Sequence, residues 1–253
     1  MPSVTDQAIC IRVWDWSETS QTVSLLTRAH GLLRGIAKGS KRPHARFSGG
    51  IDLLTRGEMI ASLKPAERGG GLTPLVAWDL QELFPGVRRS VRALYCAMAM
   101  ADLTQNALLE GDPHPEVFDA LVEALRSLER PGQDLACTCA FAWTLVDRTG
   151  HRPELDVDVN TGAPLADQPV YAFDPRRGTL GEEGSGRAAD CWRVRRETVQ
   201  YLRKLGREQV SGGEFPDETI ARALRLVLFY FREASGREMS AVRVLLGTLE
   251  NLG

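Results

Sequence analysis

Residues 22–42 read TVSLLTRAHGLLRGIAKGSKR, and this stretch decides how the first part of the chain folds. Apolar and polar side chains alternate over residues 22–27, which is typical of a half-buried strand. A short break at residues 29–31 separates this run from a second apolar run at residues 32–39. The two runs therefore predict a β-hairpin, and the glycines of the second run favour turns and a strongly bent strand.

Further short strands are predicted on both sides of this hairpin. Residues 8–14 are apolar and partly β-branched, and residues 51–54, 58–63 and 75–80 have a similar composition. Several short strands that are separated by glycine-rich turns indicate a small closed or nearly closed barrel. We place this barrel in a first domain, residues 1–82.

The hydrophobic period changes from two to about 3.6 after residue 84, which predicts a mainly helical second domain at residues 83–253. Residues 150–190 interrupt this domain, are rich in proline and glycine, and are predicted to be an irregular insertion or a mobile loop. The fold class is therefore α+β. The expected helices cover residues 91–108, 117–128, 135–148, 195–206 and 217–234, with a last short helix after Ser240.

The distribution of charge is more informative than the formal net charge of −2. Residues 19–51 contain no Asp or Glu, although the average frequency of 33 acids in 253 residues predicts about four. Lys and Arg bind a polyphosphate backbone by displacing its condensed counterions, so the cations of this window are predicted to bind nucleic acid. The alternative is a solvated loop whose charges serve solubility. The six cations are Arg28, Arg34, Lys38, Lys41, Arg42 and Arg46, and residues 37–47 are expected to form a flexible projection.

Four aromatic residues of the first domain are candidates for stacking on unpaired bases. They are Trp14, Trp16, Phe47 and Trp78. Phe47 is the best candidate, because it directly follows the basic segment. The alternative for each is a place in the barrel core or rim. Trp14 and Trp16 share a strand face by alternation, and we expect at least one of them in the core.

Enzyme signatures do not occur in the sequence. None of the four histidines belongs to an H-E-x-x-H motif, and no G-x-S-x-G or phosphate-loop pattern is present. A nuclease or nucleotidyltransferase needs a carboxylate cluster that binds magnesium, and we can place none. We therefore expect no catalytic residue, no cofactor and no enzymatic activity.

The five cysteines are odd in number and scattered, which does not suggest a disulfide scaffold. The first residues lack the pattern of a secretion signal, and no run of eighteen apolar residues occurs. The sequence therefore predicts a soluble protein of the cytoplasm.

Three stretches of the chain carry a resemblance to a known family. Residues 9–20 form the opening strand with a polar break, and residues 224–246 form a helix, a glycine and a short closing segment. The most specific stretch is residues 25–43, which carries the pattern T-x-x-x-G-x-x-x-x-x-A-K-G from Thr27 to Gly39. In this order and spacing, the three stretches resemble the RecO family of bacterial recombinational repair proteins.

The resemblance implies a recombination mediator with an N-terminal OB-fold barrel. Such a protein binds single- and double-stranded DNA, anneals strands and forms a complex with RecR. It also helps to load RecA onto gaps that are coated by single-strand-binding protein, and it is associated with the nucleoid. Carried over to matching positions, Arg34, Lys38, Lys41, Arg42 and Arg46 lie along the DNA path.

One feature of the family is missing. Many members carry a four-cysteine zinc site, where this chain reads DVNTG at residues 158–162 and GEEG at residues 181–184. The nearby acids have neither the softness nor the spacing to replace thiolates. They are Asp158, Asp174, Glu182 and Glu183. We therefore expect a zinc-finger-like insertion without its cysteines, and no metal.

A second reading is a protein adaptor whose helical domain docks partners, with DNA binding secondary. The groove between the helices that start near residues 88–89 and Asp217 is then the candidate docking site. Arg222, Arg225 and Arg232 on the last long helix are expected to meet an acidic peptide there, as the family's binding of single-strand-binding protein suggests. The alternative for each arginine is an ordinary solvated face.

Overall fold

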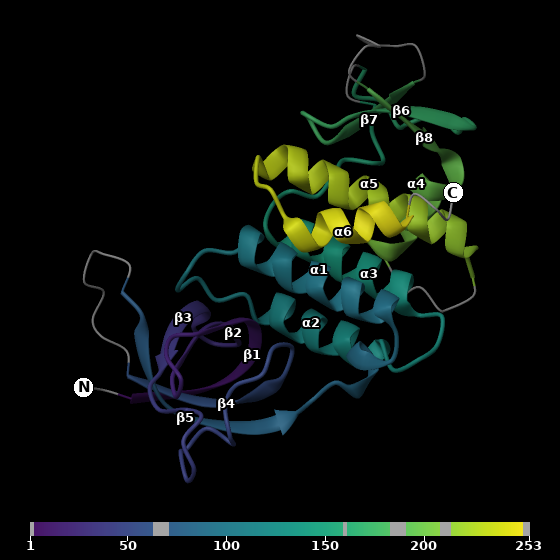
Figure 1. The fold of residues 1–253 in the computed structure, drawn as a ribbon. Helices are drawn as coiled ribbons and strands as arrows, with labels where there is room; N and C mark the ends of the chain where they lie inside the picture. The colour runs from purple at the N-terminus through teal and green to yellow at the C-terminus, as the bar shows by residue number, and fades with distance from the viewer. Residues whose placement is uncertain (1–2, 63–70, 159–160, 183–190, 208–213, 250–253) are drawn as a thin grey trace. The chain divides into compact units, whose positions relative to one another are not determined.

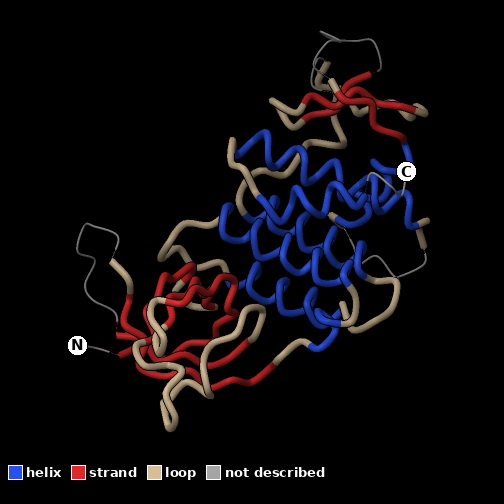
Figure 2. Tube along the Cα trace, in the orientation of Figure 1, coloured by secondary structure: helices blue, strands red, loops and turns tan. Residues whose placement is uncertain are grey.

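The structure is a computed structural model that describes residues 3–62, 71–158, 161–182, 191–207 and 214–249 (Figure 1). The chain divides into two compact units, Met1–Glu129 and Arg130–Gly253. Strands predominate in the first part of the chain and helices in the second, as Figure 2 shows, which confirms the α+β class. Among the helices that the structure describes, none has an apolar stretch long enough to cross a membrane.

Five strands of the first unit form a closed barrel in the order β1-β2-β3-β5-β4. Neighbouring strands are antiparallel except β3 and β5, which pair in parallel. The long strand β1 closes the barrel, because its first half pairs with β4 and its second half pairs with β2. The strands are β1 (Ser3–Asp15), β2 (Gln21–Thr27), β3 (Gly31–Ala37), β4 (Arg56–Ser62) and β5 (Thr73–Glu82).

A β-bulge interrupts the pairing of β1 with β2 between Cys10 and Arg12. A bulge inserts one extra residue into a strand and so reverses which side chains face inward beyond it. Before the bulge, Ala8 and Cys10 lie in the barrel core, and after it Val13 packs against that core. The bulge therefore decides which residues at the end of β1 face outward.

The predicted strand at residues 51–54 is not formed. Leu54 has a φ of 57°, which takes the backbone out of the extended conformation. The segment instead crosses β1 beside the bulge, where Leu54 N donates to Cys10 O at 2.8 Å and Cys10 N donates to Thr55 O at 3.0 Å. Ile51 is fully buried, so the apolar composition that suggested a strand reflects packing in the core.

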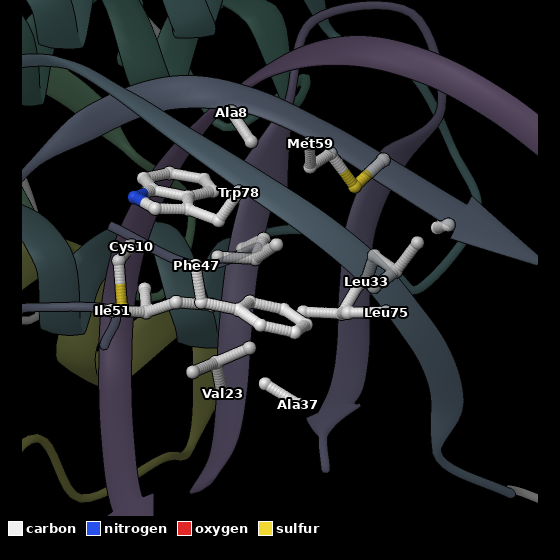
Figure 3. Packing of buried hydrophobic residues seen from close by; sticks show 12 residues of the cluster. Ala8, Cys10, Val23, Leu33, Ala37, Phe47, Ile51, Met59, Leu75 and Trp78 are labelled. Atoms are coloured by element: carbon white, nitrogen blue, oxygen red, sulfur yellow. The ribbon is translucent and has the colours of Figure 1, made fainter. Parts of the chain in front are cut away.

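The barrel core contains side chains from every strand and from the segment that connects β3 to β4 (Figure 3). Trp78 of β5 is its largest member and is 2% exposed. Gly57 lies against this indole, since a Cβ atom at that position would approach the ring to within 2.7 Å. The close approach of β4 to β5 therefore requires a glycine there.

The first unit ends with a 3-10 helix η1 (Pro85–Arg88) and two α-helices, α1 (Val91–Ala107) and α2 (Pro115–Ser127). Ser90 caps α1 by accepting a hydrogen bond from Ala93 N at 3.1 Å. Proline stands at the start of α2, where its missing N–H costs nothing. Both α-helices agree with the predicted ranges to within a few residues.

The second unit contains α3 (Asp134–Arg148), α4 (Arg196–Leu205), α5 (Asp217–Ser235) and α6 (Ser240–Leu249), again close to the predicted ranges. It also contains a three-stranded antiparallel sheet in the order β7-β6-β8. The strands are β6 (Val170–Asp174), β7 (Thr179–Glu182) and β8 (Trp192–Arg195). Residues 150–190 are thus not irregular throughout, and that prediction was wrong for the described part of the segment.

Aromatic packing holds this small sheet. Tyr171, Phe173 and Leu180 are each at most 1% exposed, and the Phe173 ring lies 5.5 Å from the Tyr230 ring of α5. Asp158 and Asp174 accept hydrogen bonds from nearby backbone N–H groups and so stabilise turns. In the part of the chain that the structure describes, no group of three or more His, Cys, Asp or Glu residues could hold a metal. Glu183 lies outside the described residues.

Candidate nucleic-acid interface

The β2–β3 hairpin has two ends with different chemistry. At its turn, Thr27 Oγ1 donates to Gly31 O at 2.8 Å, and Gly31 has a φ of 71°. At its open end, Gln21 pairs with Ala37. Six residue steps of about 3.4 Å separate these ends along β2, which is about 20 Å. The Thr and Gly of the T-x-x-x-G pattern thus build the turn, and the A-K-G that follows marks the open end.

The predicted DNA-binding cations do not share one end of the hairpin. Arg28 follows β2 at the turn, and Arg34 lies in the middle of β3 with its side chain outward. The other four extend from the open end and are exposed. We call them the basic loop: Lys38, Lys41, Arg42 and Arg46.

The basic loop, which is predicted to be a flexible projection, is hydrogen-bonded to the barrel. The buried side chain of Gln21 is central, because its Oε1 accepts from Ser40 Oγ at 2.9 Å and from Ile51 N at 3.0 Å. Lys41 N donates to Thr19 O at 3.1 Å, and Arg46 O accepts from Trp78 N at 2.8 Å. The backbone that carries the cations is therefore tied to the barrel at several points.

The charges of the basic loop are largely free. Lys38, Arg42 and Arg46 form no ion pair with any residue that the structure describes. Lys41 Nζ lies 2.5 Å from Asp15 Oδ1, and the two side chains are 35% and 69% exposed, respectively. Of the four cations of the basic loop, only Lys41 is thus paired with an acid among the described residues, which is Asp15 at the end of β1.

Arg28 and Arg34 have acidic partners within the first unit. Arg28 forms two hydrogen bonds with Asp119, at 3.0 and 2.9 Å, and this contact lowers the pKa of the carboxyl and raises the pKa of the guanidinium. Arg34 Nε lies 3.7 Å from Glu110 Oε1. A phosphate has to compete with these carboxylates, so both arginines are weaker candidates than the basic loop.

Two of the four aromatic candidates, Phe47 and Trp78, take the alternative place in the core, and the other two lie on the surface. Phe47 is 5% exposed and packs in the core near Trp78, so it offers no free face to a base in this structure. Trp14 and Trp16 are both on the surface, with exposed fractions of 48% and 63%. The expectation that at least one of them lies in the core was therefore wrong, because the bulge in β1 reverses the alternation before Trp14 is reached.

The three predicted partner-binding arginines lie in the second unit, along α5. Arg222 and Arg225 line a hollow of about 270 Å³, and Arg232 lines a hollow of about 530 Å³. Both hollows also include Trp192 and Phe229. The Arg232 guanidinium lies 5.1 Å from the centre of the Phe229 ring. Basic and aromatic side chains therefore meet on this surface.

Two of these arginines have acidic neighbours. Arg222 forms an ion pair with Glu218, and Arg232 Nη2 lies 3.5 Å from Glu233 Oε1. Arg225 forms no ion pair with the residues that the structure describes, so it is the most available of the three. Trp192 and Phe229 belong to no sequence motif, because they come together only through the pairing of β8 in the small sheet.

A closed five-stranded barrel with a basic end, followed by helices, defines a class of two-part α+β proteins. Models of one protein family match both parts. The model described as Recombination protein O N terminal matches residues 1–82, and the one described as Recombination protein O C terminal matches residues 88–241. The chain belongs to the RecO family of DNA repair proteins, as the resemblance predicted.

Curated relatives named "DNA repair protein RecO" support this assignment. The Paraburkholderia xenovorans protein is 28% identical over 97% of this chain and 77% of its own length. The Geobacter sulfurreducens protein is 26% identical over 88% of this chain and 89% of its own length. For the Rhodopirellula baltica protein, the identity is 32% over 58% of this chain, and the match spans about half of that relative, 53%.

Proposed function

We propose that this protein is a non-enzymatic recombination mediator that binds single- and double-stranded DNA at the open end of its barrel. The observation that carries this proposal is the basic loop, which presents four exposed cations on a backbone fixed by Gln21. Ordered cations at the mouth of a small barrel can follow a phosphate backbone without reading its sequence.

The barrel itself supports an OB fold. Five strands close in the order β1-β2-β3-β5-β4, and the family's N-terminal model covers this region to residue 82. OB folds bind oligonucleotides on one face of such a barrel. We accordingly propose a functional boundary after residue 82, with residues 83–253 as the helical domain, although η1, α1 and α2 belong to the same compact unit as the barrel.

Charge reversal in the basic loop tests the proposal. The variant K38E/K41E/R42E is expected to weaken binding to every DNA sequence and to flatten the plot of log affinity against log salt by about two to three units. Fluorescence anisotropy with labelled oligonucleotides measures both quantities. Unchanged binding by this variant would place the DNA elsewhere on the protein.

A matched control separates the site from the total charge. The variant R130E/R148E/R237E changes the net charge by the same amount at three exposed arginines of the second unit. It is expected to shift affinity only slightly, because the proposal places the phosphate contacts on the basic loop. An equal loss in both variants would mean that overall charge, and not the basic loop, governs binding.

The second unit is the proposed docking site for protein partners in the cytoplasm. Arg222, Arg225 and Arg232 combine with Trp192 and Phe229 into a surface that fits an acidic, partly apolar peptide, such as the C-terminal tail of single-strand-binding protein. Cooperation with RecR, strand annealing and the loading of RecA complete the proposed role. Arg225→Glu is expected to abolish binding of the tail peptide and to leave binding of naked DNA unchanged.

This aromatic and basic surface also favours a second candidate, a protein adaptor with only incidental DNA binding. The two candidates differ in one measurement. If K38E/K41E/R42E abolishes repair in cells that depend on this protein, DNA binding is essential; if repair survives this variant and is lost with Arg225→Glu, the adaptor role is the better account.

A further inference from the structure

We infer that Trp14 and Trp16 form a stacking platform for unpaired bases, which gives the barrel a preference for single strands over duplex DNA. The inference rests on the proposed DNA-binding function and adds the residues that select the form of the DNA. Both side chains are accessible to a ligand: Trp14 is 48% and Trp16 is 63% exposed, whereas Trp78 of the same barrel is 2% exposed.

The bulge in β1 is responsible for this exposure. Without the extra residue, Trp14 would continue the inward series of Ala8 and Cys10 and enter the core. With it, Val13 packs against the core and Trp14 points outward. The chain thus places a large apolar ring in solvent by a specific change of register.

The platform has a fixed backbone. Trp16 N donates to Ser20 O at 2.9 Å, which closes the turn between β1 and β2, and Trp14 pairs with Thr22 within the sheet. An aromatic face that is ordered before binding loses little conformational freedom when a base stacks on it. Trp14 and Trp16 therefore meet the requirement of a preformed stacking site.

A cation of the basic loop contacts the turn that carries the platform. Asp15 lies between the two tryptophans in the sequence, and its carboxylate is 2.5 Å from Lys41 Nζ of the basic loop. Lys41 N also donates to Thr19 O at 3.1 Å in the same turn. The basic loop thus contacts the turn that carries both tryptophans, and the sequence of that turn has one further acid, Glu18.

This combination favours an unpaired nucleic-acid strand as the occupant. A single strand offers both an anionic backbone for the lysines and free base faces for the indoles, whereas the bases of a duplex are stacked on one another and unavailable. An apolar protein surface would match the tryptophans but would not explain the four exposed cations. An unpaired strand matches both features.

The experiment compares wild type, W14A/W16A and W14F/W16F in the full chain. Anisotropy is measured with an oligo-dT strand and with a duplex of mixed sequence. For W14A/W16A, we expect an affinity for the single strand at least tenfold lower, since stacking on an aromatic side chain contributes substantially for each base. Affinity for the duplex is expected to change less than threefold. W14F/W16F should recover most of the lost affinity, because it keeps two aromatic faces.

Controls keep the inference falsifiable. Leu109→Ala removes another large apolar side chain of the first unit, which is 65% exposed. This variant is expected to keep the wild-type affinity for both the single strand and the duplex. Circular dichroism checks that each variant is folded. Equal effects of W14A/W16A on strand and duplex, or no effect on either, would overturn the inference while the proposed function stands. Failure of wild type to bind any DNA would instead overturn the proposed function.

Discussion

Lys41 Nζ lies 2.5 Å from Asp15 Oδ1, so an acid at the end of β1 holds one cation of the basic loop. In the proposed complex, a DNA phosphate would replace this carboxylate as the partner of the Lys41 ammonium group. The pair therefore makes Asp15 a competitor of the proposed ligand, and its removal should strengthen binding.

Asp15→Asn is accordingly expected to raise the affinity for single-stranded DNA about two- to fivefold at low salt. The salt dependence should become steeper by up to about one unit, because Lys41 then contributes fully to counterion release. Glu18→Gln is the matched control, since it removes the same charge from the same turn without releasing a lysine from an ion pair that the structure describes. Equal gains in the two variants would mean that Asp15 acts only through net charge.

Variants of Phe47 distinguish a residue of the core, whose loss lowers stability, from a residue that stacks on a base, whose loss lowers DNA affinity. Phe47→Ala should lower the free energy of unfolding by about 3–5 kcal/mol, because it leaves a cavity beside Trp78. Phe47→Leu should cost less and should keep DNA affinity within about twofold. Urea unfolding followed by circular dichroism measures stability, and anisotropy measures binding. A stable Phe47→Leu protein that had lost DNA binding would restore Phe47 as a contact residue.

Glu82 gives a prediction for pH dependence. Hydrogen bonds from Arg126 and Arg56 lower the pKa of this carboxyl below its ordinary value of 4.5. A carboxyl with a lowered pKa in the folded state stabilises the fold above its unfolded pKa, and this contribution is lost as the pH falls through the folded pKa. Thermal unfolding should therefore show Glu82→Gln less stable than wild type at pH 7, with a difference that shrinks below about pH 4.5. A difference that did not change with pH would point to lost packing.

The small sheet of the second unit should not depend on zinc. Its core is aromatic, with Phe173 packed against Tyr230, so a chelator is expected to leave the melting temperature unchanged. Phe173→Ala should destabilise the second unit by about 3–5 kcal/mol. Native mass spectrometry checks the metal content directly. A bound zinc, or a fall in melting temperature with a chelator, would contradict this account.

The sequence predicted the hairpin, the helices and the α+β class because each leaves a periodic signal over many residues. The bulge in β1 leaves no such signal, since one extra residue shifts the pattern only locally. The placement of Trp14 and Trp16 was missed for that reason. Phe47 was missed because its burial depends on how Gln21 holds the basic loop, which is a tertiary contact between residues far apart in the chain.

Residues 150–190 show a related limit. Their prolines and glycines correctly indicate frequent turns, but they also contain two strands, β6 and β7, and β6 pairs further with β8 and packs against Tyr230, both outside the segment. The cations of residues 28–46 were identified from composition alone. Only the structure separates those with acidic partners in the first unit, Arg28 and Arg34, from the exposed basic loop.

The most direct test of the central claim is the binding of wild-type protein and K38E/K41E/R42E to a labelled single strand at several salt concentrations. The account predicts binding by wild type that falls steeply with salt and does not depend on sequence, and a flatter, weaker response in the variant. Absence of binding by wild type even at low salt, or identical curves for the two proteins, would contradict the assignment of DNA binding to the basic loop.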